Sequence, residues 1–212
     1  MEWNEEVIKS ELITNFGKDY AEEIEETLRT LSSDSSRYGD WGDAGSVTID
    51  GTEYNIIRDE DEAERIATEM VKQDLEQEPS LFSQDWLQSF VYITDTDKRI
   101  MVSEEDANVR DMVEEQAEEK EFESDEEKDE WIEGQVTEHL DEFEKDLDDP
   151  INYFVEEHGM SVEDLMKQTW INIDINVAAE EAVVTDGWAH FLSLNTGKYE
   201  TTKGGLVYFR ES

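Results

Sequence analysis

Residues 124–149, SDEEKDEWIEGQVTEHLDEFEKDLDD, combine two properties that predict opposite structures. Thirteen carboxylates stand against two lysines, and acidic runs of this density are typical of disorder. Ser124 and Glu127 nevertheless have the spacing of a capping box, which favours the start of a helix. The apolar residues then recur as on one face of a helix: Ile132, Val136, Leu140, Phe143 and Leu147. We therefore predict an ordered amphipathic helix.

The composition of the whole chain also predicts a folded protein. Of the 212 residues, 36% are apolar and 10% are aromatic, including six tryptophans and eight phenylalanines. A disordered acidic chain would be poor in such residues, because it cannot bury enough apolar surface to offset its ordering entropy.

The formal net charge of −42 restricts the partners of the protein. Nucleic acids and anionic membranes would repel it, so we expect a basic protein or a cation as partner. The absence of cysteine excludes disulfides and thiolate metal sites. The amino terminus, MEWNEEVIKSEL, lacks the apolar segment of a signal peptide, and no run approaches the roughly 18 apolar residues of a membrane span. We expect a cytoplasmic protein.

Periodicity and turn signals predict an α+β fold that is mostly helical. SVTIDGTEYNII should form a β-hairpin in the N-terminal half, with Asp50-Gly51 as a type I′ turn. WINIDI should form a strand, and AHFLSL, KYETT and LVYFR a small C-terminal antiparallel meander. Helices are expected over residues 3–16, 19–31, 60–76, 80–93, 95–113, 124–149, 151–158 and 177–184.

Changes in composition suggest three parts of the chain. Residues 1–113 form a helical region with the hairpin, and residues 114–123, which have little periodicity, form an acidic linker or helix extension. Residues 124–212 form an α+β region that contains the acidic helix and the C-terminal meander.

The carboxylates of the acidic helix form two rows at helical spacing. Neighbours at i,i+3 and i,i+4 lie about 5–6 Å apart, and duplex DNA carries one charge per roughly 1.7 Å of its axis. Two parallel rows therefore approach the charge spacing of a nucleic acid. The partner-binding residues that we predict are Glu126, Glu127, Glu130, Glu133, Glu138, Asp141, Glu142 and Glu144, with Trp131, which lies off the apolar stripe.

The acidity is also compatible with two different roles. Charge runs are usually solvated helix faces, and the protein would then be an interaction or scaffold module that binds through aromatic residues such as Trp41 or Trp131. Acidic surfaces also suit a salt-rich cytoplasm. Ten lysines against seven arginines, with plentiful aromatic residues, are not what we expect of a strongly salt-adapted chain.

Catalytic and metal-binding motifs are weak. Asp186, His190 and Ser193 are close in sequence, but a catalytic triad is defined by geometry. Asp95-Thr96-Asp97 begins like an EF-hand loop, yet Arg99 occupies a ligand position and Ile100 that of the glycine. We expect no enzyme, no cofactor and no specific metal site.

Two stretches resemble a known group of proteins. DEDEAERIATEMVKQDLEQEPSLFSQDWLQSFVYITDTDKR and DGWAHFLSLNTGKYE are similar to acidic proteins of unknown activity from tailed bacteriophages. The shared features are an EA-x-RIA helix, an LEQEP-x-LF segment and a DG-x-AHFLS hairpin, and the likeness covers most of residues 53–210. It brings no catalytic residues. It implies a role in the conflict between phage and host, in which acidic inhibitors imitate DNA to block restriction, CRISPR or other DNA-binding proteins.

The charge pattern and the resemblance together predict a non-enzymatic DNA-mimic inhibitor in the host cytoplasm. Its partner would be a basic, DNA- or RNA-binding host protein, without direct contact to nucleic acid or membrane. A homodimer is compatible with the sequence.

Overall fold

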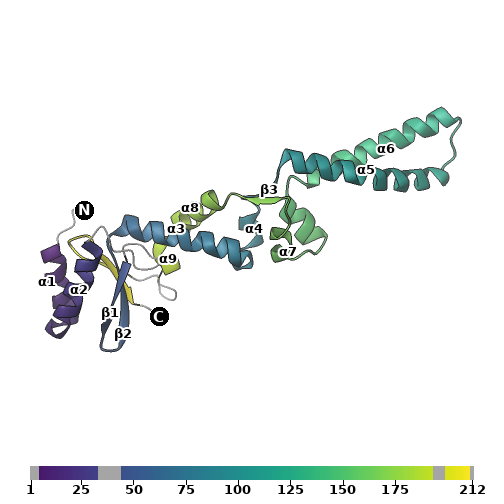
Figure 1. Cartoon of the computed structure of the whole chain (residues 1–212). Helices are drawn as coiled ribbons and strands as arrows, with labels where there is room; N and C mark the ends of the chain where they lie inside the picture. Colours follow the sequence, from purple (N-terminus) through teal and green to yellow (C-terminus); the bar gives the residue numbers. More distant parts are fainter. Residues whose placement is uncertain (1–4, 33–43, 193–198, 211–212) are drawn as a thin grey trace. The chain divides into compact units, whose positions relative to one another are not determined.

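The computed structural model describes residues 5–32, 44–192 and 199–210, which form two compact units (Figure 1). The first unit consists of residues 1–74 and 176–212, and the second, residues 75–175, is inserted between these two segments. The boundaries expected at residues 113 and 124 fall inside the second unit. The α+β fold class is confirmed, with helices over most of the chain.

The first unit is built on a four-stranded antiparallel sheet. The predicted hairpin is confirmed as β1 (Ala44–Ile49) and β2 (Thr52–Ile57). Its turn residues Asp50 and Gly51 have φ values of 50° and 74°, as a type I′ turn requires. The C-terminal strands β5 (Glu200–Thr201) and β6 (Val207–Arg210) extend this sheet in the order β1-β2-β6-β5.

Two N-terminal helices cover one face of the sheet. α1 (Glu5–Phe16) and α2 (Ala21–Ser32) are joined by a short 3-10 helix, η1 (Lys18–Tyr20). The buried side chains between helices and sheet are Ile8, Leu12, Ile24, Leu28, Leu31, Val47, Ile49, Ile56, Leu206 and Tyr208. Adjacent residues are buried in β2 and in β6, so both central strands are covered on their two faces.

Helix α2 also closes the outer edge of β1. The backbone N–H of Thr48 donates to Glu23 Oε1 over 2.9 Å. The hydroxyl of Thr27 donates to the carbonyl of Ser46 over 3.3 Å. An unpaired edge strand can pair with another chain, and these side chains occupy the groups that such pairing would use.

The segment AHFLSL was predicted as a strand, and this prediction is wrong. Gly187, with a φ of 80°, separates α8 (Ile175–Asp186) from a further helix, α9 (Trp188–Leu192). Trp188 and Leu192 are both buried, one helical turn apart. In the predicted meander this segment would have paired with β5, but burial of its apolar side chains on a helix overrides the alternating pattern. The rest of AHFLSL lies outside the described residues.

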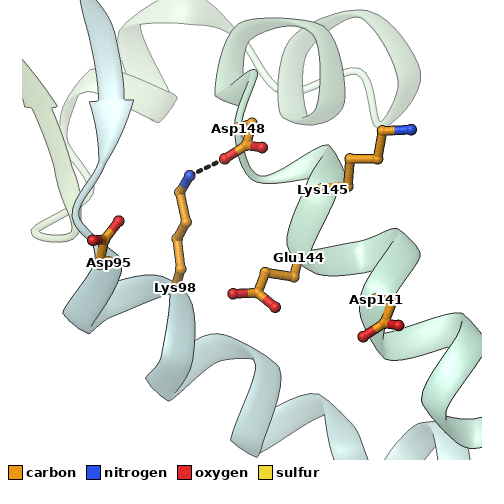
Figure 2. A pocket seen from close by; sticks show the side chains of 6 residues that line it. All are labelled: Asp95, Lys98, Asp141, Glu144, Lys145 and Asp148. Atoms are coloured by element: carbon orange, nitrogen blue, oxygen red, sulfur yellow. Dashed lines mark hydrogen bonds and ion pairs between the residues drawn. The ribbon is translucent and has the colours of Figure 1, made fainter.

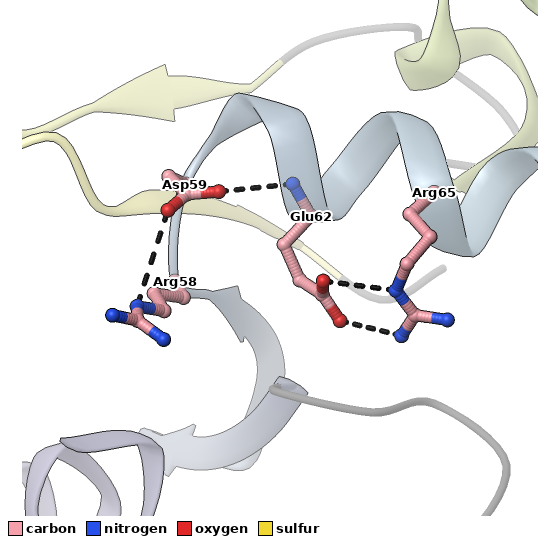
Figure 3. Close-up of polar contacts among 4 residues, drawn as sticks. All are labelled: Arg58, Asp59, Glu62 and Arg65. Carbon is pink, nitrogen blue, oxygen red and sulfur yellow. Dashed lines mark hydrogen bonds and ion pairs between the residues drawn. The ribbon is translucent and has the colours of Figure 1, made fainter. Parts of the chain in front are cut away.

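Helix α3 (Glu60–Gln77) begins with an interlocked set of polar contacts (Figure 3). The carboxylate of Asp59 accepts the backbone N–H of Glu62 over 2.9 Å, as an N-cap residue does. Glu62 in turn holds Arg65 through two hydrogen bonds of 2.9 and 2.5 Å. The cap thus satisfies a helix donor and orients the first turn.

We expect Asp59→Ala to lower the free energy of unfolding by about 1 kcal/mol, because the cap of α3 is lost. Chemical denaturation followed by circular dichroism would measure this change. Asp61→Ala removes the same charge from the same turn, where the side chain is exposed, and should cost less. Equal losses in the two variants would contradict the capping role.

The second unit joins short elements to one long helical hairpin. The short elements are η3 (Pro79–Leu81), α4 (Gln84–Leu87), β3 (Val91–Ile93), the π-helix η4 (Ile151–Glu157), α7 (Val162–Met166) and β4 (Ile171–Ile173). β3 and β4 pair antiparallel, and α7 packs against η3, η4 and β4. The hairpin consists of α5 (Asp95–Glu118) and α6 (Asp125–Asp146).

The single helix predicted over residues 80–93 is wrong. Ser83 caps a new helix, α4, with an extended backbone at φ −68° and ψ 145°. The β-branched residues Val91 and Ile93 then pair with β4, so pairing with a distant strand overrides the helical spacing. The predicted aromatic face survives locally, because the ring centroids of Phe82 and Trp86 lie 5.1 Å apart.

Candidate functional site

The α5–α6 hairpin carries most of the acidic stretch of residues 124–149. The two helices run side by side, joined by residues 119–124 (Figure 1). A seam of buried apolar residues lies between them: Val109, Val113, Ala117, Ile132 and Val136. Leu140, which the helical spacing also placed on this face, is partly buried against the seam. The predicted amphipathic helix is therefore confirmed as α6, and α5 is its packing partner.

The seam is strong enough to hold the like charges together. A repulsive carboxylate pair at i,i+4, such as Glu126–Glu130 or Glu138–Glu142, costs a few tenths of a kcal/mol. Burial of one valine or isoleucine side chain contributes about 1.5–3 kcal/mol. One buried residue such as Val113 thus offsets about five repulsive pairs, which explains why this acidic segment is ordered.

The closed end of the hairpin is held by an aromatic cluster. Ser124 caps α6 by accepting the N–H of Glu127 over 3.2 Å. The rings of Phe122 and Trp131 lie 5.8 Å apart, and both side chains are half-buried. The ammonium of Lys120 lies 3.9 Å from the centroid of the Trp131 ring, in a cation–π contact. Trp131 thus packs against Phe122 of the hairpin turn, and one face of its ring contacts the ammonium of Lys120.

The open end of the hairpin has a polar hollow in place of the seam (Figure 2). The hollow has a volume of about 340 Å³, and its lining side chains are Asp95, Lys98, Asp141, Glu144, Lys145 and Asp148. Figure 2 shows Lys98 of α5 directed at Asp148, with which it forms an ion pair. This ion pair ties the start of α5 to the segment that follows α6.

All eight predicted carboxylates of α6 are exposed. Three of them have partners within the hairpin. Glu127 accepts the backbone N–H of Glu123 over 2.7 Å, and Glu138 accepts the amide of Gln135 over 3.0 Å. Glu133 forms a bidentate ion pair with Arg110 of α5, at 2.6 and 3.3 Å. The other five predicted carboxylates of α6 are Glu126, Glu130, Asp141, Glu142 and Glu144.

The ion pair between the helices shifts both of its titrating groups. The hydrogen bonds and charge of Arg110 lower the pKa of Glu133, and Glu133 raises the pKa of Arg110 in return. Glu133 is therefore held in its charged form. Its contribution to the stability of the hairpin is present above the unfolded-state pKa and is lost as the pH falls through the lowered folded-state value.

The hairpin reaches the linear charge density of a nucleic acid. Residues 95–146 contain 23 acidic and six basic side chains, a net charge of −17. At 1.5 Å per residue the 24 residues of α5 span about 36 Å, so one net charge falls on about every 2 Å of the axis. This spacing lies between those of duplex DNA, at about 1.7 Å, and of one strand, at about 3.4 Å.

Two parts of this surface were missed in the sequence. The first is the contribution of α5 to the acidic surface, because its exposed carboxylates include Glu104, Asp111 and Glu115. The second is Gly134, an exposed glycine in the middle of α6, which costs about 1 kcal/mol relative to alanine. A β-carbon added at Gly134 would meet no atom within 4 Å. The isolated glycine in the helical pattern was the available signal.

Of the catalytic and aromatic candidates, His190, Asp186 and Trp131 lie in the described part of the chain. His190 lies exposed on α9 and Asp186 ends α8, while Ser193 and Trp41 are outside the described residues. Across residues 5–32, 44–192 and 199–210, no three carboxylate or histidine side chains converge in an arrangement suited to a metal ion. Among the helices in these ranges, none has the length and apolar character needed to cross a bilayer.

Comparison of the chain with protein-family models, curated proteins and solved structures finds no match. The resemblance to acidic phage proteins stays a prediction from the sequence. Its DG-x-AHFLS segment was expected to be a hairpin, but the described part of that segment is the helix α9.

We expect Val113→Ala to loosen both helices of the hairpin, because it removes part of the buried seam. The free energy of unfolding should fall by about 1–3 kcal/mol, and amide hydrogen exchange should accelerate in α5 and α6. Val184→Ala is the matched control, because Val184 is 84% exposed and its truncation should change stability by less than about 0.5 kcal/mol. Unchanged exchange in Val113→Ala would contradict the role of the seam.

Replacement of Arg110 by glutamine should raise the pKa of Glu133 towards its ordinary value, because the stabilising positive charge is lost. Carboxyl-carbon NMR across an acid titration would measure the shift. Arg99→Gln removes an equal charge elsewhere on α5 and should leave the pKa of Glu133 almost unchanged. A similar response to both variants would show that general charge, and not the ion pair, controls this carboxyl.

Proposed function

We propose that the protein is a non-enzymatic DNA mimic that occupies the positively charged groove of a basic nucleic-acid-binding protein. The observation that carries this proposal is the packed hairpin, which presents one net negative charge on about every 2 Å of its axis. A groove that recognises the phosphate backbone reads charge and spacing rather than base sequence. Such a groove would accept the carboxylates of α5 and α6 in place of phosphates.

The distribution of charge supports binding over simple solubility. Residues 75–175 have a net charge of −26, whereas the slightly longer remainder has −16. Acidity that served only solubility or adaptation to salt has no reason to concentrate in one unit. A groove that binds polyanions would require negative charge to be concentrated on an ordered element such as the α5–α6 hairpin.

The resemblance to phage proteins suggests the class of partner. A phage protein of this kind would act in the host cytoplasm against a defence protein, such as a restriction or CRISPR enzyme. The inhibitor would bind the enzyme without itself touching nucleic acid or membrane. Its carboxylates would displace counterions that the basic groove otherwise holds, so binding should weaken steeply with salt.

Neutralisation of the predicted carboxylates should abolish competition with DNA, because they replace the phosphates. The test uses a labelled 20-base-pair duplex bound to a helix-turn-helix repressor, a restriction endonuclease or a CRISPR effector, followed by fluorescence anisotropy. We expect displacement of the duplex from at least one of them, and the inhibition constant, calculated with the duplex affinity measured at each salt concentration, should be tenfold or more weaker at about 200 mM salt than at about 50 mM. The neutralised residues are Glu126, Glu127, Glu130, Glu133, Glu138, Asp141, Glu142 and Glu144.

A matched variant controls for total charge. It neutralises eight exposed carboxylates of the first unit and should compete almost as well as the unaltered protein: Glu6, Glu22, Glu53, Asp61, Glu64, Glu180, Glu181 and Asp186. Equal competition by both variants would contradict mimicry by the hairpin, as would the absence of salt dependence.

A scaffold module that binds through aromatic residues is the second candidate. The half-exposed face of Trp131 beside Phe122 favours it. Trp131→Ala would then weaken capture of the partner more than neutralisation of the eight carboxylates does. The same binding assay therefore separates the two functions.

A further inference from the structure

The apolar seam holds only one half of the α5–α6 hairpin. The buried residues of α5 begin at Val109, and those of α6 end at Val136. About 21 Å of α5 precedes Val109, at about 1.5 Å per residue. Phe143 lies on the apolar stripe of α6, but its ring packs on Tyr153 of η4, with the centroids 5.7 Å apart. Other contacts must therefore set the spacing of the two helices in the open half.

Repulsion between like charges acts in this open half. The polar hollow is lined by four carboxylates and two lysines, contributed by α5, by α6 and by the segment that follows α6. Figure 2 shows Glu144 pointing from α6 into the space between the helices. Carboxylates that face one another across two helices repel, which favours separation of the open ends.

Lys98 opposes this repulsion from inside the hollow. Its side chain is only 14% exposed, and its ammonium pairs with Asp148 beyond the end of α6. Lys145 carries the same charge in the lining of the hollow, but it is exposed, and Figure 2 shows it directed away from the ion pair. Salt and solvent screen a largely buried charge much less than an exposed one. Lys98 is therefore the lysine whose position suits it to hold the open end together.

We propose that Lys98 is a positioning residue of the acidic surface: its ion pair with Asp148 fixes the spacing of α5 and α6 at their open ends. The seam fixes the closed half, and the ion pair fixes the open half. Without Lys98, the lining of the hollow would hold four carboxylates and the outward-directed Lys145. The inference rests on the proposed function where it concerns the partner, because a groove for nucleic acid requires negative groups at the spacing of phosphates.

Removal of this one charge separates positioning from simple attraction. Lys98→Gln makes the protein more negative, so electrostatic attraction alone predicts tighter binding to a basic groove. Loss of the fixed spacing predicts weaker binding, because the partner must then order the two helices as it binds them. The two explanations therefore differ in the sign of the effect.

The spacing can be measured by double electron–electron resonance between nitroxide labels. The chain has no cysteine, so introduced cysteines carry the labels at chosen positions only. Arg99→Cys with Glu142→Cys labels the open end, and Glu115→Cys with Asp129→Cys labels the closed end, all at exposed positions. We expect Lys98→Gln to lengthen and broaden the open-end distance and to leave the closed-end distance unchanged.

Three further variants control the distance measurement. Lys145→Gln removes the same charge from the lining of the hollow and should leave both distances unchanged. Lys98→Arg keeps the charge and should keep the open-end distance. Asp148→Asn breaks the same ion pair at a side chain that is 69% exposed, and it should lengthen the open-end distance. This variant decides the question if Lys98→Gln also disturbs the closed end.

The competition assay with the 20-base-pair duplex gives the functional readout. We expect Lys98→Gln to displace the duplex about three- to tenfold less strongly than the unaltered protein, because the helices must be ordered on binding. Lys145→Gln should displace it as strongly or slightly more strongly, within about twofold, because salt screens an exposed charge.

Equal or stronger displacement by Lys98→Gln would overturn the inference. Unchanged open-end distances in both Lys98→Gln and Asp148→Asn would also overturn it, as would equal lengthening in Lys145→Gln. If the unaltered protein displaces no duplex, that result contradicts DNA mimicry instead, and the label distances alone then decide the positioning role of Lys98.

Discussion

The apolar contact between α5 and α6 determines where the carboxylates of the second unit lie. Without the seam of Val109, Val113, Ala117, Ile132 and Val136, mutual repulsion and chain entropy would favour a solvated, extended segment. With it, two helices hold their charged faces in a fixed register. The net charge of −17 over residues 95–146 thereby becomes a pattern in space, which is what a groove for nucleic acid can recognise.

The acidic surface is not uniform, and its irregularities have physical consequences. The ion pair of Arg110 and Glu133 neutralises charge at one point and links the two helices. Lys120 lies over Trp131 near the closed end, while Lys98 pairs with Asp148 near the open end. A flexible polyanion has no such local features. In the proposed function, these local features would add specific contacts to the long-range attraction of the charges. Long-range attraction mainly sets the association rate of a complex, whereas specific contacts mainly set its residence time.

The two units divide the physical tasks of the chain. In the first unit, α1 and α2 bury a continuous core against the sheet, and α2 side chains close the edge of β1. That unit is stabilised mainly by apolar burial, with polar side chains completing exposed backbone groups. In the second unit, the short elements around β3 and β4 anchor the chain on both sides of the hairpin. The hairpin can therefore carry a high charge, because its stability comes from its own seam.

Local patterns in the sequence determined the elements whose cause is local. Helical spacing and the Ser124 cap placed α6 and its exposed carboxylates, and Asp50-Gly51 placed the β1–β2 turn. Tertiary structure alone decided the strand β3 and the helix α9, because a distant partner strand stabilises β3 and burial of Trp188 and Leu192 stabilises α9. It also decided that α5 shares the acidic surface, since helix pairing depends on residues far apart in sequence.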